Sequence, residues 1–314
     1  MSEQLVHHQH HTNTNIHKII LSDKEKTIMK KSKSVDNSAL TYYESGFEKN
    51  RLRSNIGIIE FERTKEILLE NLPNPPAVIY DIGGAYGEYS YWLASLGYEV
   101  HLFDLFPKNI EMSNELGKEY PECSLKSAEV CDALSVPRKD KSADAVLLMG
   151  PLYHITDYSE RILAIKESTR LLKDNGILFS AALTPFSVLL HNITVYNPLG
   201  ENPDKTLEKP EFIKMVEREL HDGHHINPDN TIYSGLGSAY LHTAKALRKE
   251  LCEGGFSDTV VHGIMGGAWL ANYIDELMKN DVSRNALMNT VRLLDTCEEI
   301  IGLSGHLLAV SKKS

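Results

Sequence analysis

Short apolar runs alternate with amphipathic stretches along most of the chain. The apolar runs have the length of strands and lie at about 77–82, 99–104, 123–128, 144–149, 176–183, 257–263 and 305–311. The amphipathic stretches carry apolar residues at helical spacing, at about 87–96, 107–119, 158–173, 240–253, 267–279 and 283–298. Strands that alternate with helices predict an α/β fold, in which a mostly parallel sheet has helices on both faces.

The N-terminal part departs from this pattern. Residues 1–37 are polar, lack hydrophobic periodicity and include a run of histidines, so we expect a disordered tail without a metal site. Residues 38–75 predict an N-terminal helical cover, with helices at 42–49 and 57–72. A cluster of prolines ends the second of these helices. Folding is therefore expected to begin near residue 38.

A second departure covers residues 184–236. Prolines, glycines and asparagines surround one predicted helix at 210–220, and the segment also carries many apolar and aromatic residues. A break of this length between a strand and a helix is usually functional. We expect a lid or substrate-binding insertion after the fifth strand.

The first strand leads into a glycine-rich turn. The stretch Val78-Ile-Tyr-Asp-Ile-Gly-Gly-Ala-Tyr-Gly87 predicts a buried strand, the turn and the start of a helix, and Asp104 ends the next strand. Turn glycines let the backbone approach a ligand without an intervening Cβ. A carboxylate roughly twenty residues further on can accept hydrogen bonds from ribose hydroxyls. This arrangement predicts a nucleoside pocket.

Two nucleosides compete for this pocket, a dinucleotide such as NAD and S-adenosylmethionine. The dinucleotide motif G-x-G-x-x-G does not fit, because a start at Gly83 meets Ala85 and Glu88, and a start at Gly84 meets tyrosines. Asp81 would repel a pyrophosphate but would attract the ammonium group of a methionine. The sequence therefore favours S-adenosylmethionine.

Several motifs in order resemble those of the class I S-adenosylmethionine-dependent methyltransferases. Asp81-x-Gly83-x-Ala85-x-Gly87 stands where that family has D/E-x-G-x-G-x-G, and Asp104 stands at its ribose-binding acid. Asp132-Ala133 is similar to the acid and small residue that hold the adenine. Residues 144–154 and 171–178 resemble the fourth strand with its following loop and the approach to the fifth strand. The resemblance covers about residues 40–183 well and 240–312 more loosely.

The resemblance implies a Rossmann-like, seven-stranded, mostly parallel sheet whose last strand is antiparallel, with S-adenosyl-L-methionine as the cofactor. It also implies which residues bind that cofactor: Asp81, Gly83, Gly84, Gly87, Asp104, Asp132, Ala133, Met149 and Gly150. Arg51, Arg53 and Arg63 lie in the predicted cover, and one of them could pair with the cofactor carboxylate.

Tyr153 and His154 follow the fourth strand directly, where the family faces the transferring methyl group. An imidazole suits proton removal at neutral pH, so both residues are predicted catalytic and substrate-binding groups. His225 and Tyr240, at the exit of the predicted lid, are further substrate-binding candidates. A metal-dependent mechanism would need a cluster of acidic residues, and the sequence does not show one.

Composition and charge limit the classes of partner that the protein is expected to bind. The formal net charge of −10 over 314 residues argues against a broad nucleic-acid footprint, which needs a basic face. No apolar run reaches the roughly 18 residues that span a bilayer. The four cysteines lack metal-site or disulfide spacing. We expect a cytoplasmic protein whose partner is a small-molecule methyl acceptor, and the sequence leaves its oligomeric state open.

The function predicted from the sequence is transfer of a methyl group from S-adenosylmethionine to an oxygen or nitrogen of a small molecule. A peptide, protein or tRNA acceptor stays open, although Gly150-Pro151-Leu-Tyr153 replaces the N/D-P-P-[YF] motif of amino-methylating enzymes. A non-catalytic protein that binds S-adenosylmethionine is a further alternative.

Overall fold

The computed structural model describes residues 51–53, 55–199, 203–227, 231–232 and 236–313. The predicted tail at 1–37 and the predicted helix at 42–49 lie outside these residues. Within the described part of the chain, no helix combines the length and the apolar character needed to cross a membrane.

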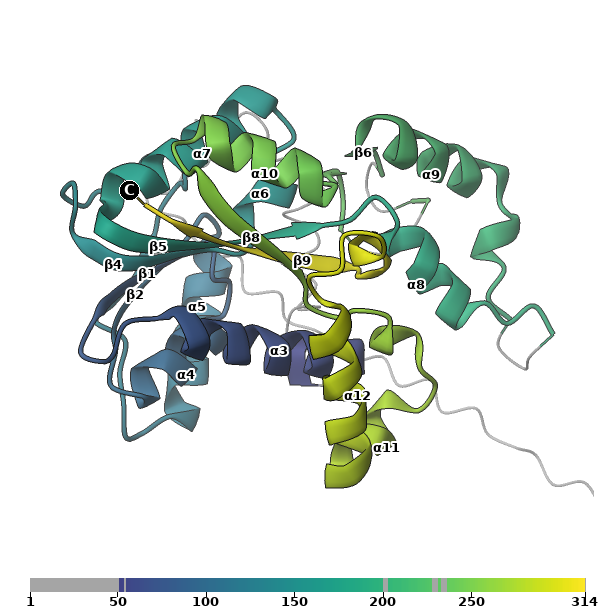
Figure 1. Ribbon diagram of the computed structural model, residues 1–314, viewed down its shortest axis with the longest axis horizontal. Helices are drawn as coiled ribbons and strands as arrows, with labels where there is room; N and C mark the ends of the chain where they lie inside the picture. The colour runs from purple at the N-terminus through teal and green to yellow at the C-terminus, as the bar shows by residue number, and fades with distance from the viewer. Residues whose placement is uncertain (1–50, 54, 200–202, 228–230, 233–235, 314) are drawn as a thin grey trace, which may run out of the picture.

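A sheet of seven strands in the order β3-β2-β1-β4-β5-β9-β8 forms the centre of the fold (Figure 1). The strands are β1 Val78–Ile82, β2 Glu99–Asp104, β3 Ser127–Val130, β4 Ala143–Leu148, β5 Leu172–Leu183, β8 Asp258–Gly263 and β9 His306–Lys312. Strands β1 to β5 pair in parallel, whereas β9 is antiparallel to both β5 and β8. The predicted sheet, including its antiparallel last strand, is confirmed.

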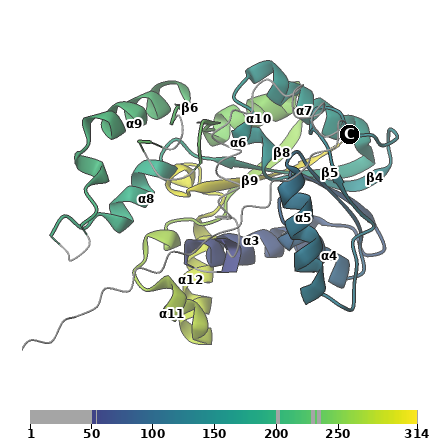
Figure 2. The same ribbon diagram turned by 180° about the vertical axis from the view of Figure 1, so that it is seen from behind.

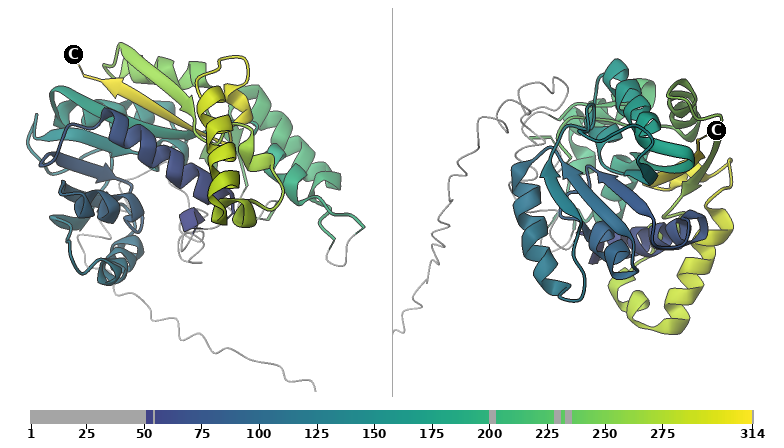
Figure 3. Two further views of the ribbon diagram at one scale, coloured as in Figure 1. Left: turned by 60° about the horizontal axis from the view of Figure 1, so that its bottom comes forward. Right: turned by 90° about the vertical axis from the view of Figure 1, so that its left-hand side faces the viewer.

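Helices cover both faces of this sheet. They are α3 Ile56–Asn71, α4 Glu88–Ser95, α5 Pro107–Leu116, α6 Pro151–His154, α7 Tyr158–Leu171, α10 Ala244–Glu253, α11 Ile274–Lys279 and α12 Asp281–Leu294. In Figure 1, α7 and α10 lie above the sheet and α3 lies below it. The view from behind shows α4 and α5 beside the β2 half of the sheet (Figure 2). Figure 3 shows α12 against the end of α3.

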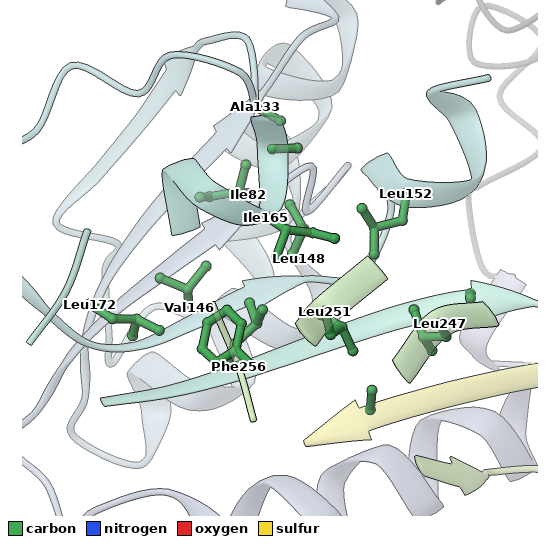
Figure 4. Packing of buried hydrophobic residues seen from close by; sticks show 14 of the residues in the cluster. Ile82, Ala133, Val146, Leu148, Leu152, Ile165, Leu172, Leu247, Leu251 and Phe256 are labelled. Carbon is green, nitrogen blue, oxygen red and sulfur yellow. The ribbon is translucent and has the colours of Figure 1, made fainter. Parts of the chain in front are cut away.

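The period of two along each strand sends alternate side chains into two cores. Val146 and Leu148 of β4 belong to the core under α7 and α10, whereas Ala145 and Leu147 belong to the core under α3 and α12. In the first core, Ile165 of α7 and the apolar side chains of α10 pack with Phe256 against the strands (Figure 4). Each fully buried large side chain contributes about 1.5–3 kcal/mol to folding.

A buried polar network joins α7 to α10. The Arg161 guanidinium donates to both carboxylate oxygens of Glu250 at 2.9–3.2 Å and to the Ile155 carbonyl oxygen at 3.0 Å. His242 Nε2 lies 3.1 Å from the same carboxylate. Burial lowers the pKa of His242, and the pKa of Glu250 is also lowered, because His242 and Arg161 outweigh the effect of burial. The network fixes the loop after α6 against the helical layer.

The predicted insertion contains more helix than expected. It comprises α8 Ser187–Val195, the short 3-10 helix Thr206–Glu208, α9 Pro210–Asp222 and strand β6 His224–His225, which pairs with β7 Ala239–Tyr240. Helix α8 was not predicted. The segment extends past the end of the sheet where β5 ends (Figure 1).

Two strand boundaries differ from the prediction by four residues, and the predicted helices at 240–253 and 267–279 begin later than expected, at Ala244 and Ile274. Strand β3 begins four residues later than expected, at Ser127, so the predicted strand residues 123–126 lie in the segment before it. Strand β5 begins earlier, at Leu172, and contains Asn175 with φ 62°. Asn tolerates this left-handed conformation, which here bends the start of a strand rather than ending a helix.

Candidate active site

The turn between β1 and α4 contains three residues with a left-handed backbone conformation. Gly83, Ala85 and Gly87 have φ values of 74°, 50° and 81°. A Cβ on Gly83 would lie 2.5 Å from Cδ of Pro151, and one on Gly84 would lie 2.4 Å from Asp81 Oδ2. These positions therefore need glycine, and Ala85 accepts a conformation that costs an L-residue about 1–2 kcal/mol.

Asp104 ends β2 beside this turn and is buried. Its Oδ2 accepts a hydrogen bond from the Ala85 amide at 2.9 Å. Its Oδ1 accepts from the Phe106 amide and from Asn109 Nδ2, both at 2.9 Å. Donors to a carboxylate favour its ionised form. The side chain is thus held as a fixed acceptor at the carboxyl edge of the sheet.

Asp81, on β1, is 1 % exposed. Ser90 donates to its Oδ2 at 2.7 Å, whereas its Oδ1 is buried without a hydrogen-bond partner among the described residues. Burial raises the pKa of Asp81 to about 7, and the Asp104 charge adds to this effect against the Ser90 hydrogen bond. A buried acceptor left open in this way suits a cationic donor from a ligand.

Two hollows adjoin at Gly83. The first, the β3-side pocket, has a volume of about 500 Å³ including its mouth and is lined by Gly83, Asp104, Leu105, Phe106, Cys131, Asp132, Ala133, Gly150, Pro151, His154 and Ile155. The second, the β5-side cleft, has about 730 Å³ including its mouth. Its walls come from the N-terminal residues 51–52, α3, the glycine turn, and the ends of β4, β5 and β9.

The structure brings most of the predicted cofactor residues to these two hollows. Asp104, Asp132, Ala133 and Gly150 line the β3-side pocket. Asp81, Gly84 and Met149 line the β5-side cleft, and Gly83 lines both. Gly87 stands one residue before α4, where its left-handed backbone starts the helix.

Asp132 and Ala133 follow β3 and form one wall of the β3-side pocket. Asp132 Oδ1 accepts from the Leu134 amide at 3.0 Å. Burial raises the pKa of Asp132. A half-buried carboxylate beside an alanine wall offers an acceptor to an exocyclic amine and a flat surface to a ring.

Tyr153 and His154 are neighbours on α6 but face different hollows. Tyr153 lines the β5-side cleft together with Asp81 and Met149. His154 is 8 % exposed and lines the β3-side pocket with Asp104 and Asp132. Their rings contact each other, with centroids 4.7 Å apart. The structure thus places Tyr153 at the β5-side cleft and His154 at the β3-side pocket.

His225 and Tyr240 line neither hollow. His225 is fully buried, and its Nδ1 lies 2.6 Å from Glu219 Oε1. Tyr240 stacks on the Arg161 guanidinium, 3.6 Å from its ring centroid. Among the described residues of 184–236, none lines either hollow. Tyr240 thus contacts the buried network around Arg161, whereas His225 pairs with Glu219 within the insertion.

The three arginines of the cover have separate places. Arg51 lines the β5-side cleft and donates to Glu60 at 2.7 and 3.2 Å. Arg53 pairs with Glu88 and Glu119. Arg63 is buried against Asp295, away from both hollows. Arg51 is therefore the arginine that lies near the predicted cofactor.

Comparison with known proteins identifies the kind of domain that carries this site. Residues 80–180 match the family described as "Methyltransferase domain". Residues 80–180 form a methyltransferase domain, and the chain has the class I methyltransferase fold. A solved SAM-dependent methyltransferase from Methanosarcina mazei aligns with 79 % of this chain and 96 % of its own, at a TM-score of 0.50 and 20 % identity. One from Mesorhizobium loti aligns with 81 % of this chain and 100 % of its own, at 0.51 and 16 %. These likenesses show the methyltransferase fold.

Curated relatives of this methyltransferase domain carry the name "Probable tRNA methyltransferase 9B". The human protein is 31 % identical over 118 residues and the bovine protein 30 % identical over the same length. The match covers 37 % of this chain and 23 % of each relative. The chain thus spans about a quarter of the length of the curated relatives that it matches.

S-adenosylmethionine is the cofactor of such domains, and the residues present fit it. Asp81 Oδ1 offers a buried, open acceptor to the methionine ammonium. A side chain at Gly83 or Gly84 would collide with Pro151 or Asp81, so both residues present only backbone atoms to the cleft that they line. Asp104 and Asp132 offer acceptors to a ribose diol and an adenine amine from one pocket. The methyltransferase domain thus presents matching chemistry for each part of the cofactor.

Proposed function

We propose that the chain transfers the methyl group of S-adenosylmethionine to an oxygen or nitrogen of a small-molecule acceptor. The observation that carries this proposal is the junction of the two hollows at Gly83. Adenosine occupies the β3-side pocket, the methionine portion lies along Asp81 and Gly84, and space remains in the β5-side cleft.

When bound, S-adenosylmethionine supplies an electrophilic methyl group on a sulfonium sulfur. The chain positions the reactants and excludes water, which is the main task of a protein in a displacement of this kind. Asp81 and Arg51 hold the two charged ends of the methionine portion. Tyr153, on the cleft side of α6, orients the acceptor. His154 supports the adenosine from the β3-side pocket.

The cleft also favours some acceptors over others. Its ionisable lining consists of Glu60, Asp81 and Glu88 against Arg51, together with tyrosines and His306. An excess of carboxylates and aromatic rings favours neutral or cationic acceptors over phosphorylated ones. This charge, with the net −10 of the chain, supports a small molecule rather than a polyanion.

A tRNA acceptor is the second candidate, because the curated relatives carry a tRNA methyltransferase name. Their likeness covers 37 % of this chain and 23 % of each relative, so it is too partial to carry the relatives' acceptor over to this chain. A tRNA substrate would need cationic surface that tracks its phosphates. We therefore rank it below a small molecule.

The two candidates separate in one assay. The purified chain is incubated with S-adenosylmethionine labelled in the methyl group and either deacylated total tRNA or a panel of phenols, catechols and amines. We expect label in the small-molecule fraction and none in tRNA. Label in tRNA would reverse the ranking, and tight binding of S-adenosylhomocysteine without transfer to any acceptor would indicate a binding protein.

A further inference from the structure

His306 lies at the edge of the sheet where methyl transfer is expected. It is the first residue of β9, and the antiparallel register pairs it with Leu183, the last residue of β5. The first residue of an antiparallel strand therefore meets the carboxyl ends of the parallel strands. Ligands of α/β sheets bind at this edge.

The side chain of His306 belongs to the wall of the β5-side cleft. His306 and Leu308 share one face of β9, and both line the cleft with Tyr153 and Ala181. The imidazole is about 20 % exposed. It is thus accessible from the cleft while most of the ring is covered.

Glu60 of α3 stands behind this imidazole. Its carboxylate lies 3.7 Å from His306 Nε2, and it accepts two hydrogen bonds from Arg51. Burial alone would raise the pKa of Glu60, but the charges of Arg51 and His306 hold it below its usual range. A buried, ionised carboxylate stabilises a protonated imidazole beside it.

We propose that His306, supported by Glu60, is the base that takes the proton of the methyl acceptor. The acceptor is then a molecule whose nucleophilic atom has a lone pair and carries a proton that must leave on methylation, such as a phenolic hydroxyl or a neutral amine. This inference rests on the proposed function, because it assumes that the methyl group faces the β5-side cleft.

The step balances without a further reactant. The lone pair of the acceptor atom forms a bond to the methyl carbon, and the carbon–sulfur bond breaks with its electron pair going to sulfur. The proton of the acceptor passes to the His306 nitrogen that does not face Glu60. The products are the methylated acceptor, S-adenosylhomocysteine and an imidazolium paired with Glu60, which later releases the proton to water.

Other ionisable groups of the cleft suit this role less well. Tyr89 is half-buried, and desolvation of its hydroxyl raises its pKa well above the usual value, so it stays protonated. Asp81 faces the methionine ammonium, and Glu88 is paired with Arg53. Among the described residues, Tyr86, Tyr153 and Arg51 are the remaining ionisable groups that line the cleft. His154 lines the other hollow.

The first test needs no acceptor. NMR follows the histidine ring protons of the full chain through a pH titration, in complex with S-adenosylhomocysteine and in complex with sinefungin. Sinefungin carries an amine where the methyl group would be. The His306 signals are assigned by their loss in His306→Asn, and His101 on β2 serves as the internal control.

We expect the titration midpoint of His306 to be lower by about one pH unit with sinefungin, because a nearby cation disfavours the imidazolium. The His101 midpoint should be the same in both complexes. Equal His306 midpoints would overturn the role of His306 while leaving the cofactor site intact. Failure of both compounds to bind would instead overturn the proposed function and this inference with it.

The second test uses any acceptor that the labelled panel identifies. His306→Asn should lower kcat by about 100-fold or more, with the affinity for S-adenosylhomocysteine unchanged. Glu60→Gln should move the acid limb of the kcat–pH profile to lower pH, because it removes the charge that stabilises the imidazolium. A kcat within threefold of the wild-type value in His306→Asn would contradict the proposal.

Discussion

Asp104 accepts a hydrogen bond at 2.9 Å from the backbone amide of Ala85, which ties the end of β2 to the glycine turn after β1. The carboxylate that is expected to bind ribose therefore also holds the loop that surrounds the methionine portion. We therefore expect cofactor affinity and the shape of the turn to depend on the same side chain.

Asp104→Ala should weaken the binding of S-adenosylhomocysteine by more than about tenfold, since hydrogen bonds to a charged acceptor contribute about 1.5–3 kcal/mol. Calorimetric titration measures the affinity, and thermal unfolding shows whether the variant is folded. Glu99→Ala, at the exposed start of the same strand, is the matched control and should bind normally. Near-normal affinity in a folded Asp104→Ala would refute the ribose assignment.

Asp81 should make cofactor binding depend on pH. Its pKa is raised to about 7, and only the ionised form attracts the methionine ammonium. The affinity for S-adenosylhomocysteine should therefore fall about tenfold between pH 8 and pH 6. Adenosine, which lacks the ammonium, should bind equally at both pH values. A pH-independent affinity for S-adenosylhomocysteine would count against this role.

The same carboxyl should destabilise the protein without ligand at high pH. Because its folded pKa lies above the unfolded value of 3.8, the folded state holds an additional proton between these values. Its contribution to stability is present below about pH 4 and is lost as the pH rises to about 7. Urea unfolding should show Asp81→Asn to be more stable than the wild type at pH 8 and similar to it at pH 4. Lower stability of the variant at pH 8 would contradict this sign.

A comparison of Gly83→Ala with Gly97→Ala separates the cost of backbone strain from the cost of side-chain crowding. Gly83 and Gly97 both have positive φ, but a Cβ at Gly97 would meet only Pro75, at 3.7 Å. Gly97→Ala should therefore lower the free energy of unfolding by about 1–2 kcal/mol, the cost of left-handed backbone. Gly83→Ala should cost more, because its Cβ would lie 2.5 Å from the Pro151 ring. Equal losses in urea unfolding would show that the turn has room for a side chain.

Glu250→Gln should destabilise the fold by about 3–5 kcal/mol, because it leaves the buried Arg161 without its counter-charge. Lys249→Ala, one residue earlier on the exposed side of α10, should change stability by less than about 1 kcal/mol. Urea unfolding of both variants makes the comparison. A similar, small change in both would mean that the buried network contributes little to stability.

Sequence patterns predicted the sheet well where strands are buried on both faces. Strand β2 has the predicted bounds, and β1, β4 and β9 differ by one residue at one or both ends. Strand β3 was displaced because it lies at the edge of the sheet, where its residues are only half-buried and give a weak apolar signal. Helix α8 was not predicted from the sequence.

The gathering of most predicted cofactor residues at one edge of the sheet could be predicted, because they follow strands directly and the carboxyl ends of parallel strands share one edge. The sequence could not show that Tyr153 and His154 line different hollows. Neighbouring residues on one helical turn point in different directions, and the orientation of the turn depends on packing. Glu60 and His306 were missed because α3 and β9 meet only through the folded sheet. The one available signal was the position of His306 at the start of the last predicted strand.

The most direct test of the central claim is calorimetric titration of the purified chain with S-adenosylhomocysteine and with NAD. The account predicts micromolar binding of S-adenosylhomocysteine at one site per chain and no binding of NAD. Binding of NAD, or of neither compound, would contradict it.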